Sequence, residues 1–264
     1  MQRDIEPFLF SVLLPIYGER ESNNIIKYIL PSIENLSDPE FNLVVERLST
    51  SEPWQYIVGK EWFYDLEFKV TKETLIPRPE TEELVYHILK NHSENHLSLL
   101  DIGTGTGCIP IAIKKNRPSW EVSACDISDG ALMIAQENSD LHQTKIQLFK
   151  EDILHPKPSS QKWDIIVSNP PYIPTREKSL MSKNVLDFEP HQALFVTDED
   201  PLIFYRKIGE FALQHLSPSG FLYFELNEYY AAETKELIGN LGFKEVEIIE
   251  DLMEKNRMLK AIKE

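Results

Sequence analysis

The spacing of apolar residues changes along the chain, and its first part has a helical period. Up to about residue 50, apolar positions recur at intervals of three or four, as on one face of an amphipathic helix. Asp38 followed by Pro39 is a suitable start for one of these helices, because a carboxylate can cap free amides and proline fits the first turn. We therefore predict a small helical domain over residues 1–60. The apolar positions behind this prediction are Ile25, Ile26, Ile29, Leu30, Phe41, Val44, Val45 and Leu48.

A short pair of strands is expected next. Residues 62–64 and 67–70 have strand character, and we place the turn between them at Asp65 and Leu66. Residues 61–78 are accordingly predicted to form a β-hairpin linker.

From residue 79 to residue 264, apolar strands alternate with amphipathic helices. This pattern is typical of an α/β domain with a doubly wound, mostly parallel sheet covered by helices on both faces. Residues 170–199 follow neither period and contain several prolines, so we interpret them as a long active-site loop. The seven predicted strands lie at 98–102, 121–125, 145–149, 163–168, 220–226, 244–249 and 258–262.

Composition and charge narrow the possible functions. Hydrophobic residues make up 42% of the chain and no apolar run reaches membrane-spanning length, so we expect a cytoplasmic protein without a membrane partner. The net charge of -16 disfavours direct nucleic-acid binding and favours a protein partner that presents Lys and Arg. Cys108 and Cys125 fall in apolar segments, so we expect buried reduced thiols. The scattered histidines predict no metal site.

A glycine-rich turn follows the first strand of the α/β domain and indicates a nucleotide-like ligand. Its glycines allow the main chain to lie against a ligand, and the next helix points free amides into the same crevice. Asp126 ends the second strand, where a carboxylate can accept hydrogen bonds from both ribose hydroxyls. The residues assigned to this part of a cofactor site are Gly103, Thr104, Gly105, Thr106, Gly107 and Asp126.

The spacing of the glycines and three further residues, Asp101, Asp152 and Ile153, indicate which adenosine cofactor is bound. The glycines are spaced G-x-G-x-G, which weakens the case for NAD. Asp101 would repel a pyrophosphate but could pair with the ammonium of a methionine moiety, as in S-adenosylmethionine. Asp152 follows the third strand and is placed to meet the adenine, with Ile153 as an apolar surface against the ring. The simpler alternative is that Asp101 and Asp152 are only turn residues at strand ends.

The fourth strand runs directly into Asn169-Pro170-Pro171-Tyr172, at the strand end where open α/β sheets bind ligands. An amide nitrogen is a poor nucleophile, so its methylation needs hydrogen-bond acceptors more than a strong base. The side-chain oxygen of Asn169 and the carbonyl of Pro170 could accept its N–H groups, held rigidly by the two prolines. Tyr172 could stack on the target. Alternatively, Pro-Pro only ends the strand and Tyr172 packs in the core.

We therefore predict Asn169, Pro170 and Tyr172 as catalytic, with Pro171 completing the substrate site. Over roughly residues 50–264 the sequence resembles the N(5)-glutamine methyltransferases of peptide chain release factors. The segments that carry the resemblance are Leu75-Ile76-Pro77-Arg78-Pro79-Glu80-Thr81-Glu82, Asp101 to Gly107, Asp126-Ile127-Ser128 with Ala131-Leu132, Ser168 to Ile173, and Glu189-Pro190 with Ala193-Leu194.

The resemblance implies a class I, Rossmann-like methyltransferase fold with a helical domain in front that docks the substrate. It implies S-adenosylmethionine as cofactor, a release factor as partner, and the glutamine of a Gly-Gly-Gln motif as target. It places the cofactor site on 103–107, Asp126, Ile153 and Asn169, and the glutamine site on 169–172. We expect such an enzyme to be monomeric.

The chain departs from the family pattern at 196–200 and 225–228, and we expect both segments to lie away from the methyl-transfer centre. Other functions remain open at this point. An N(6)-adenine nucleic-acid methyltransferase and a ribosomal-protein glutamine methyltransferase share Asn-Pro-Pro-Tyr, although the first should show a basic face. A non-catalytic module that binds an adenosine ligand would have no need of Asn169.

Overall fold

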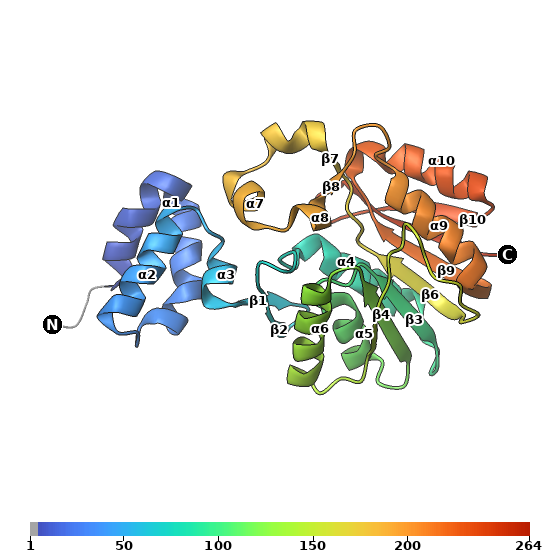
Figure 1. The fold of residues 1–264 in the computed structure, drawn as a ribbon, viewed down its shortest axis with the longest axis horizontal. Coiled ribbons are helices and arrows are strands. Elements are labelled where there is room, and N and C mark those ends of the chain that lie inside the picture. The colour runs from blue at the N-terminus through green and yellow to red at the C-terminus, as the bar shows by residue number, and fades with distance from the viewer. Residues whose placement is uncertain (1–4) are drawn as a thin grey trace.

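The computed structural model describes residues 5–264, so residues 1–4 of the predicted helical domain lie outside the described part. Three helices form a separate lobe, drawn in blue on the left of Figure 1: α1 (Ile5–Ile33), α2 (Asp38–Ser49) and α3 (Trp54–Val58). Helix α1 bends at Gly18, whose φ of 75° interrupts the helical backbone. The lobe has its own apolar core, which includes Leu9, Ile29, Phe41 and Leu48.

Helix α2 starts with a different cap from the one predicted. Ser37 precedes the helix, and its N–H and hydroxyl donate to the Glu40 carboxylate at 2.9 and 2.6 Å. Asp38 and Pro39 are already helical. A serine and a glutamate three residues apart therefore replace the predicted Asp38 cap.

A two-stranded hairpin follows, formed by β1 (Lys60–Phe63) and β2 (Leu66–Lys69). Phe63 lies opposite Leu66, so the turn residues are Tyr64 and Asp65, with φ of 51° and 61°. The predicted turn at Asp65 and Leu66 is wrong by one residue. The apolar pattern could not reveal which two residues take positive φ.

The rest of the chain is built on a seven-stranded sheet in the order β10-β11-β9-β6-β3-β4-β5. All neighbouring strands from β9 to β5 run parallel, and β11 is antiparallel to both its neighbours, which confirms the predicted mostly parallel sheet. The order reverses between β3 and β6, and ligands bind at such a reversal. The strands are β3 (Ser98–Ile102), β4 (Glu121–Asp126), β5 (Gln147–Lys150), β6 (Trp163–Ser168), β9 (Leu216–Glu225), β10 (Lys244–Glu250) and β11 (Asn256–Ile262).

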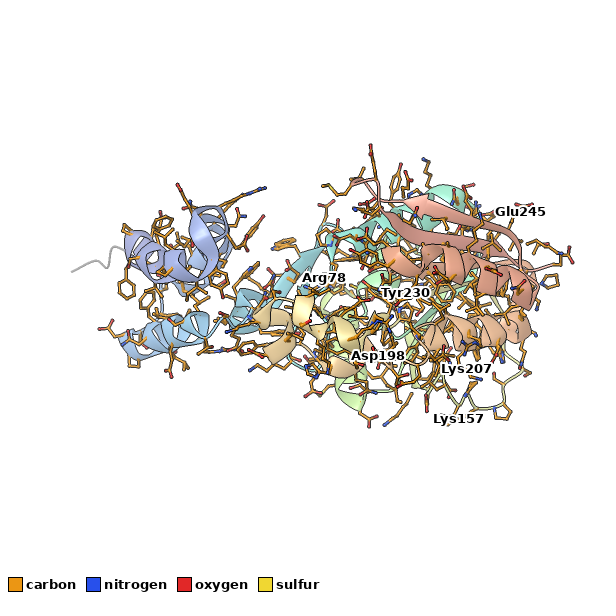
Figure 2. All side chains as sticks on the ribbon, turned by 90° about the horizontal axis from the view of Figure 1, so that it is seen from above. Arg78, Lys157, Asp198, Lys207, Tyr230 and Glu245 are labelled. Carbon is orange, nitrogen blue, oxygen red and sulfur yellow. The ribbon has the colours of Figure 1, made fainter. Side chains whose placement is uncertain are left out.

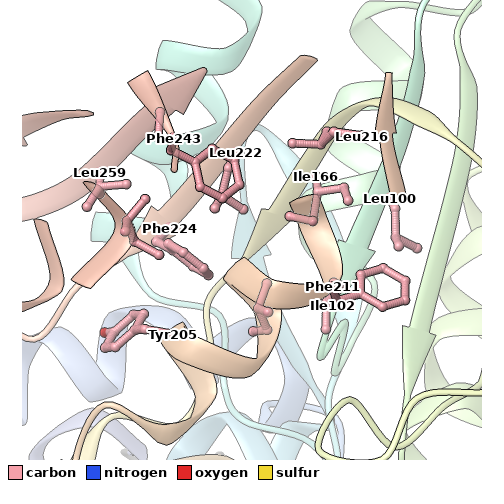
Figure 3. Close-up of a cluster of buried hydrophobic side chains, with 14 of the residues drawn as sticks. Leu100, Ile102, Ile166, Tyr205, Phe211, Leu216, Leu222, Phe224, Phe243 and Leu259 are labelled. Atoms are coloured by element: carbon pink, nitrogen blue, oxygen red, sulfur yellow. The ribbon is translucent and has the colours of Figure 1, made fainter. Parts of the chain in front are cut away.

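Helices cover both faces of this sheet. Alternate residues of a strand point to opposite faces, so Leu99 packs with α4 (Pro79–Asn91) and α5 (Cys108–Asn116). Leu100 packs with α9 (Ile203–His215) and α10 (Ala231–Leu241). Figure 3 shows the second of these clusters, in which Tyr205 and Phe211 of α9 lie against the sheet. A further large helix is α6 (Asp129–Leu141).

The segment predicted as a long loop contains short regular elements, so that prediction is wrong in part. Each element spans at most six residues, too few to show a period in the sequence. In Figure 1 the segment forms the yellow arm above the hairpin, with α7 reaching toward the helical lobe. Its elements are β7 (Ile173–Pro174), η1 (Thr175–Leu180), α7 (Lys183–Phe188), α8 (His191–Leu194) and β8 (Phe195–Val196), and η2 (Glu228–Tyr230) follows β9.

Composition led to expectations about the two cysteines and about membrane-spanning segments. Cys108 and Cys125 are buried free thiols, as predicted, and burial raises the pKa of Cys108 to about 12. Between residues 5 and 264, no helix has both the length and the apolar character needed to cross a membrane.

Candidate active site

A cavity of about 450 Å³ opens at the carboxyl ends of β3, β4 and β6, beside the reversal in strand order. Most predicted site residues line it, although they come from the ends of four different strands, β3, β4, β5 and β6. Asp101, Gly107 and Tyr172 do not. The predicted residues that line the cavity are Gly103, Thr104, Gly105, Thr106, Asp126, Asp152, Ile153, Asn169, Pro170 and Pro171.

The glycine turn has two kinds of glycine. Gly103 and Gly105 have φ of 76° and 54°, and a Cβ at either would meet no heavy atom within 4 Å. Gly107 also has a positive φ, but a Cβ there would lie 3.1 Å from Ile111 and 3.3 Å from Ala135. The first two glycines leave open space beside the cavity, whereas Gly107 is required by the packing of α5 against α6.

Asp126 braces this turn. Its Oδ2 accepts the N–H of Gly105 and its Oδ1 accepts the N–H of Ser128, both at 2.9 Å. Burial raises the pKa of Asp126, and the two N–H donors act against that rise. Each carboxylate oxygen has a second lone pair, so Asp126 can hold the turn and still accept a ligand hydroxyl.

Asp101 lies behind the turn and is completely buried. Neither of its carboxylate oxygens makes a hydrogen bond of normal geometry among residues 5–264, although the nearby Thr104 hydroxyl is close enough to lower its pKa. Burial raises the pKa of Asp101 to about 7. An unpaired buried carboxylate is costly, so the site fits a ligand that brings a cation. The ammonium of S-adenosylmethionine would meet this need.

Asp152 and Ile153 occupy another edge of the cavity. Ile153 is 8% exposed and packs with the α9 side of the core. Asp152 accepts the N–H of Leu154 at 3.0 Å and Nδ1 of His155 at 2.9 Å, and the bond from His155 lowers the pKa of Asp152. The pair therefore combines an apolar surface with a charged acceptor, which fits an adenine ring.

Asn169 is held by two residues that sequence reasoning missed as site residues. Its Nδ2 donates to Thr81 Oγ1 at 3.2 Å, and Thr81 donates to Glu225 Oε2 at 2.5 Å. One N–H of Nδ2 is engaged by Thr81, so Asn169 Oδ1 is the side-chain acceptor that remains for a ligand. Glu225 ends β9 as Asp126 ends β4, and this strand-end position is the signal that could have identified it.

Tyr172 differs from its predicted role. Its ring packs against the core, and its hydroxyl donates to Glu225 Oε1 at 3.1 Å. Its carbonyl accepts Nδ2 of Asn227 at 3.1 Å. The side chain thus packs in the core, as in the alternative interpretation of this motif, and its stacking on the target stays a prediction. The expectation that residues 225–228 lie away from the centre is wrong, because the end of β9 lies beside β6 and braces the loop that follows it.

An ion pair closes the cavity on the side of the helical lobe. Arg78 lies 2.6 Å from Glu189 Oε1, and the Glu189 side chain is 1% exposed. Glu189 Oε2 also accepts the N–H of Ile76 at 3.3 Å. Both Arg78 and Pro190 line the cavity, and Figure 2 shows Arg78 between the helical lobe and the sheet. This pair ties the segment after the hairpin to the arm at 175–194.

A second cavity, of about 620 Å³, lies between α1 and the hairpin. Tyr28 and Trp54 stack there with ring centroids 5.4 Å apart. Burial raises the pKa of Glu61 at this site. Its lining contains four acidic residues and no basic one: Glu21, Glu61, Asp65 and Glu82.

Comparisons with known proteins bear on the family of the chain. Residues 80–189 match the family model described as "Methyltransferase small domain". The chain is 43% identical to the release factor glutamine methyltransferase of Flavobacterium psychrophilum over 264 residues, covering 98% of this chain and 92% of the relative. It is 44% identical to the enzyme of that name from Bacteroides thetaiotaomicron over 223 residues, covering 84% and 80% of the two chains.

Solved structures support the fold. A methyltransferase from Pyrococcus furiosus superimposes with a TM-score of 0.56 and 21% identity, covering 75% of this chain and 89% of its own. A 16S rRNA N2 G1207 methyltransferase of T. thermophilus, solved with AdoMet and guanosine, gives a TM-score of 0.54 at 16% identity, covering 78% and 50%. At these identities the likeness shows the class I methyltransferase fold alone.

Proposed function

The chain belongs to the family of release factor glutamine methyltransferases, and we propose from this premise that it methylates the glutamine of the Gly-Gly-Gln motif in peptide chain release factors. The methyl group comes from S-adenosylmethionine and goes to the side-chain amide nitrogen. One observation carries the proposal. Asn169, whose Nδ2 donates to Thr81, and the glycine turn line the same cavity.

The carboxylates at or near the ends of the strands would form the cofactor site. S-adenosylmethionine, when bound, supplies a sulfonium methyl group that a nitrogen lone pair can attack. Asp101 would pair with the ammonium, Asp126 would accept the ribose hydroxyls, and Asp152 with Ile153 would meet the adenine. The unpaired state of Asp101 supports this assignment, as does the open space beside Gly103 and Gly105.

The target amide would be held by two acceptors. Its lone pair is delocalised, so the chain must orient the nitrogen and stabilise the positive charge that develops on it. Asn169 Oδ1 and the carbonyl of Pro170 would each accept one N–H, and Pro171 limits the conformations of the loop. Tyr172 would act as a brace for this loop, supported by its bonds to Glu225 and Asn227.

The helical domain, residues 1–60, would dock the release factor, joined by the hairpin linker at 61–78 to the methyltransferase domain at 79–264. The acidic cavity between α1 and the hairpin supports a protein partner with basic residues. The net charge of -16 argues against direct contact with nucleic acid. We further propose that the protein acts as a monomer in the cytoplasm.

Labelled S-adenosylmethionine offered with three acceptors tests this function. The acceptors are a release factor that contains Gly-Gly-Gln, a ribosomal protein mixture and duplex DNA. We expect label on the release factor, and loss of that label when its Gly-Gly-Gln glutamine is replaced by alanine. Label found only on DNA or only on ribosomal proteins would contradict the proposal.

A further inference from the structure

The side chain of Asn169 is the outer end of a hydrogen-bonded chain that leads into the protein interior. Asn169 Nδ2 lies 3.2 Å from Thr81 Oγ1, and Thr81 Oγ1 lies 2.5 Å from Glu225 Oε2. The hydroxyl of Tyr172 occupies the other carboxylate oxygen at 3.1 Å. Thr81 and Glu225 are 3% and 2% exposed, so water has little access to this chain.

The chemistry of a carboxylate gives this chain a direction. Thr81 has a single hydroxyl proton, and it donates that proton to Glu225 Oε2. Thr81 must then accept from Asn169, and only Nδ2 can donate. Burial raises the pKa of Glu225, while the two hydroxyl donors and the nearby Arg257 favour its charged form. The Glu225 carboxylate, at the buried end of this hydrogen-bonded chain, therefore determines whether the oxygen or the nitrogen of the Asn169 amide faces the cavity.

We propose that Glu225 is a positioning residue that sets the direction of the Asn169 amide through Thr81, so that Oδ1 faces the substrate. The inference rests on the proposed function, because a target N–H needs an acceptor. With the amide reversed, Nδ2 of Asn169 would oppose the N–H groups of the glutamine. The target nitrogen would then be neither oriented nor stabilised as it gains positive charge.

Glu225→Gln tests this role, because it keeps the side-chain shape but adds an NH2 group that can donate to Thr81. We expect kcat to fall roughly 10- to 100-fold, with little change in KM for the release factor or in Kd for S-adenosylhomocysteine. Thr81→Val removes the hydroxyl and should lower kcat similarly. Thr81→Ser keeps the hydroxyl and should retain most of the turnover.

The double variant Glu225→Gln/Thr81→Val distinguishes positioning from a general structural effect. Because Glu225 acts through Thr81, the double variant should be no slower than Thr81→Val alone, whereas independent effects would multiply. Thr234→Val is the matched control. Thr234 is also fully buried, and its hydroxyl has no partner in the described part of the chain, so its removal should leave kcat unchanged.

A second readout does not depend on turnover. The NMR signal of the Asn169 side-chain amide, assigned by its loss in Asn169→Asp, should shift in Glu225→Gln and in Thr81→Val but not in Thr234→Val. Failure of the wild-type protein to methylate a release factor would contradict the proposed function, and the amide signal would still report on Glu225. An unmoved signal, a Glu225→Gln kcat within about twofold of wild type, or multiplying effects in the double variant would overturn the inference.

Discussion

The two halves of the active-site cavity are built in opposite ways. On the cofactor side, the carboxylate of Asp101 is buried behind the glycine turn and makes no hydrogen bond of normal geometry among the described residues. On the amide side, Asn169 is tied to Thr81 and Glu225 through consecutive hydrogen bonds. A buried carboxylate without a hydrogen-bond partner favours the binding of a cationic ligand. The Asn169 amide, in contrast, is already oriented by hydrogen bonds before a ligand binds. The first half is suited to binding and the second to orienting a weak nucleophile.

Asn169→Ala should give the largest loss of turnover, and it should affect catalysis without affecting cofactor binding. It removes the side-chain acceptor but no carboxylate of the cofactor side, so kcat should fall about 100-fold or more while Kd for S-adenosylhomocysteine changes little. Steady-state transfer of labelled methyl groups measures kcat, and calorimetry measures Kd for S-adenosylhomocysteine. Turnover that survives the substitution would remove Asn169 from the mechanism.

Asp126→Ala should show the reverse pattern. It removes the acceptor for the Gly105 N–H and the predicted ribose acceptor, so Kd for S-adenosylhomocysteine should rise roughly 10- to 100-fold. At saturating cofactor, kcat should recover to near the wild-type value. A loss of kcat that saturation does not repair would mean that the two halves are not separable.

The unpaired state of Asp101 predicts a pH dependence of cofactor binding. Its pKa of about 7 means that it holds a proton below neutral pH, and a bound ammonium would favour the charged form. Binding should therefore release a proton, and Kd for S-adenosylhomocysteine should weaken roughly tenfold from pH 8 to pH 6. Calorimetry in buffers of different ionisation enthalpy measures that proton. Asp101→Asn should abolish its release, and an equal proton release in this variant would contradict the assignment.

The same shift affects the unliganded protein. A folded pKa above the ordinary value of 3.8 means that the folded state binds the proton more tightly than the unfolded state does. This group's contribution to stability is therefore full below about pH 4 and is lost as the pH rises through about 7.

The smallest expected effect lies outside both halves, in the acidic cavity beside the helical lobe. Glu21→Gln together with Glu61→Gln should raise KM for the release factor by roughly two- to fivefold at low salt, and by less at high salt, because salt screens the attraction between this open acidic cavity and a basic partner. Glu245→Gln is the control, since Figure 2 shows Glu245 at the far end of the molecule. An equal change in KM for the control would remove the acidic cavity from substrate docking.

The difference between the halves also explains what the sequence could predict. Asp101, Asp126 and Asp152 each stand within or just after an apolar strand, so local pattern placed them at one edge of the sheet. Thr81 and Glu225 are 144 residues apart and meet only because α4 packs against β9. No local sequence pattern predicts this contact. The same glutamate accepts the hydroxyl of Tyr172, which is why the Tyr172 side chain faces the protein interior.

The short elements between 173 and 196 were missed for a related reason. β7 and β8 are two residues each, and their pairing of Ile173 with Phe195 depends on the tertiary fold. The seven strands of the sheet were predictable because each carries enough apolar residues to be recognised alone.

A structure of the protein with S-adenosylhomocysteine and a Gly-Gly-Gln peptide tests the central claim most directly. We predict the glutamine side-chain nitrogen at about 3 Å from both Asn169 Oδ1 and the carbonyl oxygen of Pro170, with the cofactor sulfur on its open side. A glutamine nitrogen that lies outside hydrogen-bond reach of both oxygens would contradict the account.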